Sequence, residues 1–294
     1  MSSYKLVKNY KDNSELRKSF NELAYNTFGI SFESWYLNNF WQERYQPFSF
    51  VDGNRVIANV SVNELDLIIF GESKRAVQIG TVMTNPIYRN RGLSRKLMNE
   101  VLETYENKYD VMYLFANQSV LDFYPKFGFH PVEEYQYTIG RTNVKSNGKS
   151  RIQKLDGNRK EDLHFIYKFA SNRIPVSSNF ATRHTQELLM YYCINIFPNN
   201  IYYLEDEDVI IIYEIQNDDI HLYDLISKEK IRFEKIIDYL ATNNAQKVVF
   251  HYTPDYEGFE FEIKLFHDET VLFVKKKNDV VLPTQFKHPI TAQA

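Results

Sequence analysis

The sequence predicts an α+β protein of two tandem domains, each with a mixed, mostly antiparallel, twisted sheet flanked by helices. The chain has 294 residues, a length at which single hydrophobic cores usually stop growing. Extended and helical patterns alternate along it, and nearly the same order of elements recurs in the second half. Hydrophobic residues make up 44% and charged residues 25%, which is typical of a globular protein that folds completely.

The first half follows the order β-α-α-β-β-β-α-β-α-β. Helices are expected over 14–28, where Ser14 is a suitable N-cap, and over 32–44. Three extended runs at 55–65, 65–72 and 76–85 are typical of an antiparallel meander. A helix follows Gly92 and runs to about residue 107. The other expected elements are strands at 4–7, 110–117 and 132–140, and a short helix at 119–128.

The polar stretch 142–151, "TNVKSNGKSR", has no periodicity and is the expected linker between a domain at 1–141 and a domain at 152–294. The second half repeats the element order with helices at 162–173, 186–197 and 230–245, and strands at 201–206, 209–216, 221–227, 246–254, 259–266 and 270–277. An unrelated α+β domain is the alternative for this half.

Composition argues against disulfide-bonded, metal-binding and membrane-spanning classes of protein. Cys193 is the single cysteine, which excludes an internal disulfide and a Cys-rich zinc site and predicts a core residue. The seven histidines show no metal-ligand spacing, so no metal is expected. No apolar run is long enough to span a bilayer, and the N-terminus has no apolar signal region. We therefore expect a cytoplasmic protein. Its net charge of −3 favours binding neither to a membrane nor to nucleic acid. The sequence leaves open whether the protein forms a homo-oligomer.

A glycine and four cations stand at the start of the helix that follows residue 92. The stretch "PIYRNRGLSRKL" contains Arg89, Arg91, Arg95 and Lys96 around Gly92. The first turn of a helix has unpaired N–H groups and partial positive charge, so the amides of residues 90–94 can converge on a pyrophosphate. Arginines at the rim can bind further phosphate oxygens. The alternative is a solvated, basic helix start.

Two blocks, "VMTNPIYRNRGLSRKLM" and "FANQSVLDFYPKFGF", resemble the GNAT acetyltransferases. The first contains the pattern Arg/Gln-x-x-Gly-x-Gly/Ala of the acetyl-CoA loop, with Ser in the last place. The matching residues are Arg89, Gly92 and Ser94 in the first block, and Asn117, Tyr124, Gly128 and Phe129 in the second. The resemblance covers about residues 4–140 and implies the three-layer α/β GNAT fold.

The resemblance also implies acetyl-CoA as co-substrate and names the residues that would bind it. These are Val82, Met83, Thr84, Arg89, Asn90, Arg91, Gly92, Leu93, Ser94, Arg95 and Asn117. Tyr124 would protonate the departing thiolate, since a phenol with a pKa near ~10 suits a thiol near ~8.5. The alternative for Tyr124 is one more core aromatic among 22 tyrosines.

The general base is less clear from the residues. Some GNAT members carry Glu on the strand before the loop, where this chain has Gln78, which cannot accept a proton. Glu64 on the preceding strand is the candidate, although a charged strand residue usually faces solvent. Proton loss to water, followed by direct attack of the free amine, needs no dedicated base.

The predicted function is therefore acetyl-CoA-dependent transfer of an acetyl group to a primary amine of a small molecule or peptide. Trp35, Tyr36 and Trp41 are candidates for the acceptor cleft or for the core. The second domain lacks the phosphate-binding loop and is expected to be a degenerate copy. Two alternatives are a non-catalytic acyl-CoA-binding or regulatory module, and a tandem scaffold without a cofactor. The acidic run at 205–208 is expected to be a charged turn, with attraction of cationic substrates as its alternative.

Overall fold

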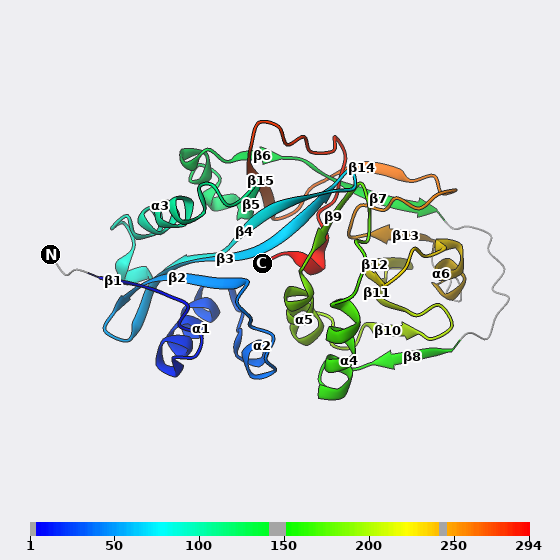
Figure 1. Ribbon diagram of the computed structural model, residues 1–294, viewed down its shortest axis with the longest axis horizontal. Coiled ribbons are helices and arrows are strands. Elements are labelled where there is room, and N and C mark those ends of the chain that lie inside the picture. The colour runs from blue at the N-terminus through cyan, green and yellow to red at the C-terminus, as the bar shows by residue number, and fades with distance from the viewer. Residues whose placement is uncertain (1–3, 141–150, 241–245) are drawn as a thin grey trace.

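The protein is described by a computed structural model that covers residues 4–140, 151–240 and 246–294. Two twisted sheets lie beside each other, with helices packed on them (Figure 1). This confirms the α+β class with two mostly antiparallel sheets. The expected linker lies outside the described residues except for Arg151, as does the end of the helix expected at 230–245.

The first sheet has the strand order β1-β2-β3-β4-β5-β15-β6, with β9 paired to β3. These strands are β1 (Lys5–Lys8), β2 (Tyr45–Asp52), β3 (Arg55–Ile69), β4 (Glu72–Thr84), β5 (Val111–Asn117), β6 (His130–Val132), β9 (Phe180–Arg183) and β15 (Thr270–Lys276). β4 and β5 are parallel, and the other pairs are antiparallel.

The second sheet has the strand order β14-β7-β13-β12-β11-β10-β8. These strands are β7 (Glu134–Gly140), β8 (Ile152–Leu155), β10 (Ile201–Leu204), β11 (Val209–Gln216), β12 (Asp219–Ser227), β13 (Lys247–Phe250) and β14 (Glu262–Phe266). Its one parallel pair in the described residues is β12 with β13.

The two sheets exchange strands. β7 belongs to the first half of the chain but lies between β13 and β14 of the second sheet. β15 belongs to the second half but lies between β5 and β6 of the first sheet. Counted from β1 in the first sheet and from β8 in the second, the two orders correspond, and in each the sixth strand is the last strand of the other half.

Six α-helices are described. They are α1 (Ser14–Phe28), α2 (Glu33–Leu37), α3 (Leu93–Tyr105), α4 (Lys160–Ala170), α5 (Gln186–Asn195) and α6 (Phe233–Leu240). The N-cap of α1 is Asn13, whose side chain accepts from the Leu16 N–H at 3.1 Å, so Ser14 is the first helical residue and not the cap. α2 ends at Leu37, well before the expected residue 44.

The bounds of β3 and β4 differ from those of the expected strands, because the turn between them lacks the sequence that usually signals a hairpin. β3 continues to Ile69 and turns through Phe70 and Gly71, whose φ angles are +51° and +82°. Two such residues form the tight turn that matches the twist of a hairpin, and Asn-Gly is its common sequence. The run 65–72, expected as a separate strand, is thus the end of β3, the turn and the start of β4. β2 and β9 were not expected.

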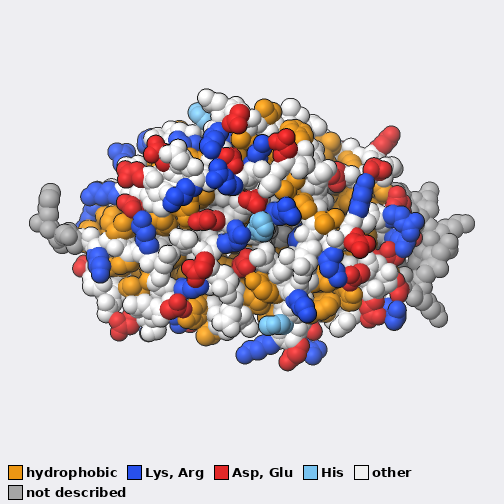
Figure 2. Space-filling model, in the orientation of Figure 1, with side chains coloured by type: hydrophobic (Ala, Val, Ile, Leu, Met, Phe, Trp, Pro, Cys, Tyr) orange, Lys and Arg blue, Asp and Glu red, His pale blue; other side chains and the backbone are white. Residues whose placement is uncertain are grey.

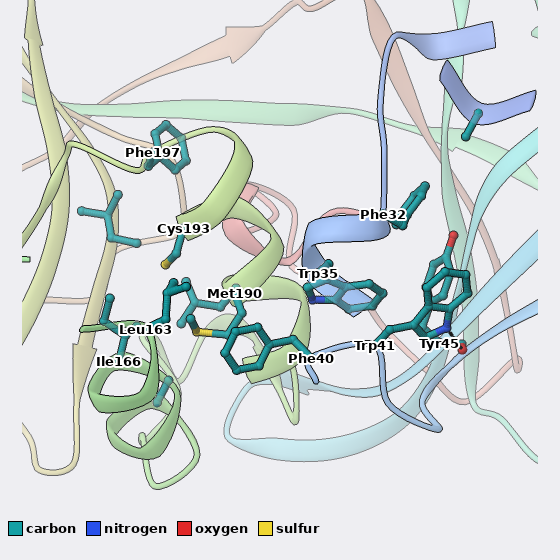
Figure 3. Packing of buried hydrophobic residues seen from close by; sticks show 14 of the residues in the cluster. Phe32, Trp35, Phe40, Trp41, Tyr45, Leu163, Ile166, Met190, Cys193 and Phe197 are labelled. Carbon is teal, nitrogen blue, oxygen red and sulfur yellow. Dashed lines mark hydrogen bonds between the residues drawn. The ribbon is translucent and has the colours of Figure 1, made fainter. Parts of the chain in front are cut away.

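One hydrophobic cluster joins the two halves (Figure 3). Trp35 and Trp41 are 1% and 2% exposed and stack with ring centroids 5.9 Å apart. Cys193 of α5 belongs to the same cluster and is fully buried, which confirms its expected place in the core. The cluster is shared by helices of both halves, so the two sheets are held together by a continuous core.

The last residues of the chain run between the two sheets, where Figure 1 shows the C-terminus. Buried polar contacts hold them. Thr291 donates to Asp224 of β12 at 2.6 Å, and the same carboxylate accepts two hydrogen bonds from Arg173 at 2.7 and 2.8 Å. Tyr192 of α5 donates to the carbonyl of Gln293 at 3.1 Å. The C-terminal segment is therefore fixed by the second half.

The free energy of unfolding is expected to fall as the pH drops below about 6.5, because the buried His288 and the partly buried His251 are both held in neutral form. Burial lowers the pKa of His251 and of His288 to about 3. Between these values only the unfolded chain binds the protons, so acid favours unfolding. Each histidine should remove about 2 kcal/mol between pH 7 and pH 5, measured by urea unfolding at both values.

The matched control is the exposed His130. Replacing His251 by Gln should reduce the difference between the two pH values, while His130→Gln should leave it unchanged. An equal pH dependence in the wild type and His251→Gln would contradict the assignment.

No helix in the described part of the chain is long and apolar enough to cross a membrane. On the face shown in Figure 2, basic and acidic side chains are interspersed.

Candidate functional site

The first sheet opens where its two parallel strands separate. β4 and β5 are paired from Ala76 with Val111 to Ile79 with Leu114, and both strands continue beyond the last pair. The edge of residues 80–84 that faces β5 therefore has no strand partner. Backbone N–H and C=O groups on such an edge are available to an extended ligand.

A cavity of about 880 Å³ occupies this opening, within the range of small-molecule sites. It brings together most of the residues predicted from the sequence. The predicted residues that line it are Val82, Met83, Thr84, Arg89, Asn90, Gly92, Leu93, Ser94, Arg95, Asn117 and Tyr124. Arg91 and Glu64 are not among its lining residues.

The start of α3 forms one end of the cavity. Gly92 is the N-cap with φ of +71°, and Asn90 also has a left-handed backbone, with φ of +62°. No side chain caps the helix. The first amides of α3 thus have neither an intrahelical acceptor nor a side-chain cap, which is the arrangement that favours an anion.

The strand and the helix are tied together at this end. The hydroxyls of Thr84 and Ser94 hydrogen-bond to each other at 2.7 Å. Arg89 donates from Nε to the carbonyl of Thr84 at 3.3 Å, and its side chain is otherwise exposed. Arg95 is exposed as well. Two guanidinium groups therefore stand beside the uncapped helix start, where they can contact phosphate oxygens.

Arg91 points away from the cavity. It donates from Nη2 to the carbonyl of Ile87 at 3.1 Å, and its guanidinium lies 5.0 Å from the centre of the Tyr88 ring. Its Nη1 donates to the hydroxyl of Tyr4. The structure thus uses Arg91 to hold β1 and the loop together.

Tyr124 lines the cavity from the opposite side. It begins the 3₁₀ turn Tyr124–Phe127, which Gly128 ends with a left-handed backbone. The residue is 5% exposed and packs on Phe123 and Phe273. No described residue hydrogen-bonds to its hydroxyl. Burial raises the pKa of Tyr124 to about 12, so the phenol carries its proton at neutral pH.

Glu64 is held elsewhere. Its carboxylate accepts from the hydroxyl of Tyr105 of α3 at 2.8 Å, on the α3 face of the sheet. Gln78 lies on the other face, opposite Asn63, and is fully buried. Both polar atoms of the Gln78 amide and the Asn63 Nδ2 have no hydrogen-bond partner among the described residues. The structure does not bring Glu64 to the cavity.

Sequence reasoning missed several lining residues. Thr27, Phe28 and Ile30 come from the end of α1 and the segment after it. Gly80 and Ala294 meet at the wall, because a Cβ on Gly80 would lie 2.8 Å from the carbonyl carbon and oxygen of Ala294. A glycine inside a strand signals close backbone approach and could have identified Gly80. No sequence signal connects residue 294 to it.

The aromatic candidates for the acceptor cleft belong to the core instead. Trp35 donates from Nε1 to the carbonyl of Glu187 at 2.7 Å, and Trp41 donates to the carbonyl of Tyr45 at 3.2 Å. Tyr36 packs against Arg17 and donates to Asp12. None of the three lines the cavity.

The second sheet opens in the same way but differs at the loop. β12 and β13 are paired only up to Leu222 and Phe250. The loop at 228–232 has no glycine, and Lys230 is paired with Glu257 at 2.8 Å. The C-terminal segment meets this opening, where the Ile290 N–H donates to the carbonyl of His251 at 3.1 Å.

The described residues contain no group of three or more His, Cys, Asp or Glu side chains that could hold a metal ion.

Residues 11–132 match the model of the acetyltransferase (GNAT) domain. Among curated protein sequences, none is significantly similar to the chain.

Solved structures share the fold over both sheets. A probable N-acyltransferase from Enterococcus faecalis V583 has a TM-score of 0.65 and 16% identity, covering 94% of this chain and 72% of that one. Eis1 from Mycobacterium abscessus has a TM-score of 0.59 and 12% identity, covering 92% and 72%. A GCN5-related N-acetyltransferase from Kribbella flavida has a TM-score of 0.56 and 15% identity, covering 92% and 72%.

Proposed function

From the premise that residues 11–132 match the model of the acetyltransferase (GNAT) domain, we propose that the chain is an acetyl-CoA-dependent N-acetyltransferase that acts on a primary amine of a small molecule or peptide. One observation carries the proposal. A single cavity has an uncapped helix start with two arginines at one end and the protonated phenol of Tyr124 on its wall.

The residues present fit acetyl-CoA. The amides at the start of α3, with Arg89 and Arg95, would hold the pyrophosphate and a further phosphate. The free edge of Val82, Met83 and Thr84 would pair with the pantetheine arm as an added strand does, and Asn117 would hold the arm from the β5 side. The orphaned edge and the uncapped amides each gain partners in this arrangement.

Acetyl-CoA supplies the activated acetyl group. The chain contributes orientation of both reactants and a proton at the hydroxyl oxygen of Tyr124, which would pass to the departing thiolate. Because the carboxylate of Glu64 accepts from Tyr105 and does not line the cavity, we propose that the acceptor ammonium loses its proton to water.

The chain would divide into domains at 1–141 and 152–294. The second domain would be a degenerate copy of the first and would bind no ligand of the same kind as acetyl-CoA. Its loop lacks a glycine, its Lys230 is paired, and the C-terminal segment meets its strand opening. Its role would be to fix that segment against Gly80 and so complete the first site. We place the protein in the cytoplasm, in line with its single, buried cysteine.

Calorimetric titration with acetyl-CoA tests the proposal. The wild type should bind one equivalent, and Arg89→Ala should raise the Kd about tenfold, because a charge-assisted hydrogen bond to phosphate is lost. Arg159→Ala is the matched control, since Arg159 is an exposed arginine of the second half that does not line the cavity. Absence of binding heat in the wild type would contradict the proposed function.

A further inference from the structure

β4 carries a β-bulge just beyond the point where it leaves β5. Its last pair with β5 is at Ile79. Two residues of β4, Thr81 and Val82, then stand opposite the single residue Val60 of β3. An extra residue of this kind bends the strand that contains it. The bend lies where the two parallel strands separate, at the wall of the candidate cavity.

Thr81 has a backbone conformation that its side chain disfavours. Its φ angle is +47°, and a β-branched residue is an outlier in the left-handed region. Such a conformation persists only where neighbouring groups hold it, and it is common beside ligand sites. The bulge therefore needs contacts from the rest of the sheet to keep its shape.

Two buried side chains hold Thr81, one at its carbonyl and one at its hydroxyl. Asn59 donates from Nδ2 to the carbonyl of Thr81 at 2.9 Å, and the hydroxyl of Tyr45 shares a hydrogen bond of 2.7 Å with the hydroxyl of Thr81. Asn59 is fully buried and Tyr45 is 4% exposed. Thr81 lines the cavity and these two residues do not, so they act on the cavity through it.

The orientation of the Asn59 amide is fixed by a chain of buried hydroxyls. Its Oδ1 accepts from the Ser49 hydroxyl at 2.8 Å, which bonds to the hydroxyl of Tyr10 at 2.6 Å. Its Nδ2 also donates to the Ser61 hydroxyl at 2.9 Å. The oxygen and the nitrogen of the amide are thus both engaged, and a fully satisfied buried network is rigid. Asn59 is therefore held in the orientation that meets Thr81.

The edge of β4 beyond the bulge is the part of the cavity that would hold the pantetheine arm. Resting on the proposed function, we infer that Asn59 is a positioning residue for acetyl-CoA: by holding the carbonyl of Thr81, it keeps the bulge in shape and the edge of residues 82–84 in place for the arm. The phosphates would bind farther along, at the start of α3. Loss of Asn59 should therefore weaken the hold on the arm and spare the hold on the phosphates.

Calorimetry with two probes tests this role. Acetyl-CoA has both the phosphates and the arm, whereas adenosine 3′,5′-bisphosphate has phosphates without the arm. Asn59→Ala should raise the Kd for acetyl-CoA about tenfold and change the Kd for the bisphosphate less than twofold. Asn63→Ala is the matched control, because Asn63 is a buried asparagine of the same strand that pairs with Gln78 before the bulge. It should leave both Kd values within twofold of the wild type.

A second variant covers the case in which Asn59→Ala does not fold. Tyr45→Phe removes one hydroxyl and keeps the ring contacts with Phe32 and Trp35. It should raise the Kd for acetyl-CoA about threefold and spare the bisphosphate. An unchanged Kd for acetyl-CoA in the folded variant, or an equal rise for both probes, overturns the inference while the cofactor assignment stands. Absence of acetyl-CoA binding in the wild type overturns the proposed function itself.

Discussion

Replacing Tyr124 by Phe is expected to lower kcat about 10- to 100-fold while the Kd for acetyl-CoA changes less than twofold. The substitution removes only the hydroxyl, and general acid catalysis typically contributes at least that factor. The ring contacts with Phe123 and Phe273 are retained, so the fold and the cavity should persist. Steady-state kinetics with a primary amine that the wild type acetylates, and calorimetry with acetyl-CoA, measure the two effects.

Tyr109→Phe is the control, since Tyr109 is 7% exposed, belongs to the same hydrophobic cluster and does not line the cavity. It should leave both quantities unchanged. If Tyr124→Phe also changed neither, the non-catalytic acyl-CoA-binding or regulatory module would become the better interpretation. Because burial raises the pKa of Tyr124 to about 12, the wild-type kcat should not fall through its deprotonation at any pH from 7 to 10.

The largest effect on stability is expected at Asp224. This residue is 1% exposed and accepts two hydrogen bonds from Arg173 and one from Thr291. Asp224→Ala leaves the buried guanidinium without its counter-charge, a loss of about 3–5 kcal/mol in the free energy of unfolding. Urea unfolding at pH 7 measures it.

Two variants control for this effect. Glu262→Ala removes one partner of a pair that is 72% and 60% exposed, and should cost much less than Asp224→Ala because water screens the pair. Thr291→Val keeps the buried ion pair and removes only the bond to the C-terminal segment, so it should cost less than Asp224→Ala. A similar cost for Asp224→Ala and Glu262→Ala would show that the buried pair contributes no more than an exposed one.

The part of the site that is built from residues close together in the sequence could be predicted. The loop at 89–95 and Tyr124 are encoded in short segments in which glycine, arginine and tyrosine have fixed spacing. Their convergence on one cavity followed from the strand and helix that carry them. Glu64 was expected on a strand, and it lies on β3. The face of the sheet that it occupies depends on how β3 pairs with β4. This pairing could not be predicted, because the turn at Phe70 and Gly71 was expected to be part of a strand.

The rest depends on contacts between residues far apart in the chain. The packing of Ala294 on Gly80, the pairing of β9 with β3 and the exchange of β7 and β15 have no local pattern that indicates them. β2 was missed although its pattern is extended. Its Pro47 lies just beyond the last pair with β1, Lys8 with Phe48, so the missing N–H costs no hydrogen bond on that side.

Because β7 and β15 are exchanged, neither half of the chain can complete its sheet without the other half. A product that stops near residue 141 would carry a gap between β5 and β6, where Thr270 normally pairs with Asn117 and Leu272 with Val132. During synthesis, the sheet of the first half cannot close until β15, which lies in the last tenth of the 294 residues, has been made. A self-sufficient first half would therefore need residues 270–276 grafted into it.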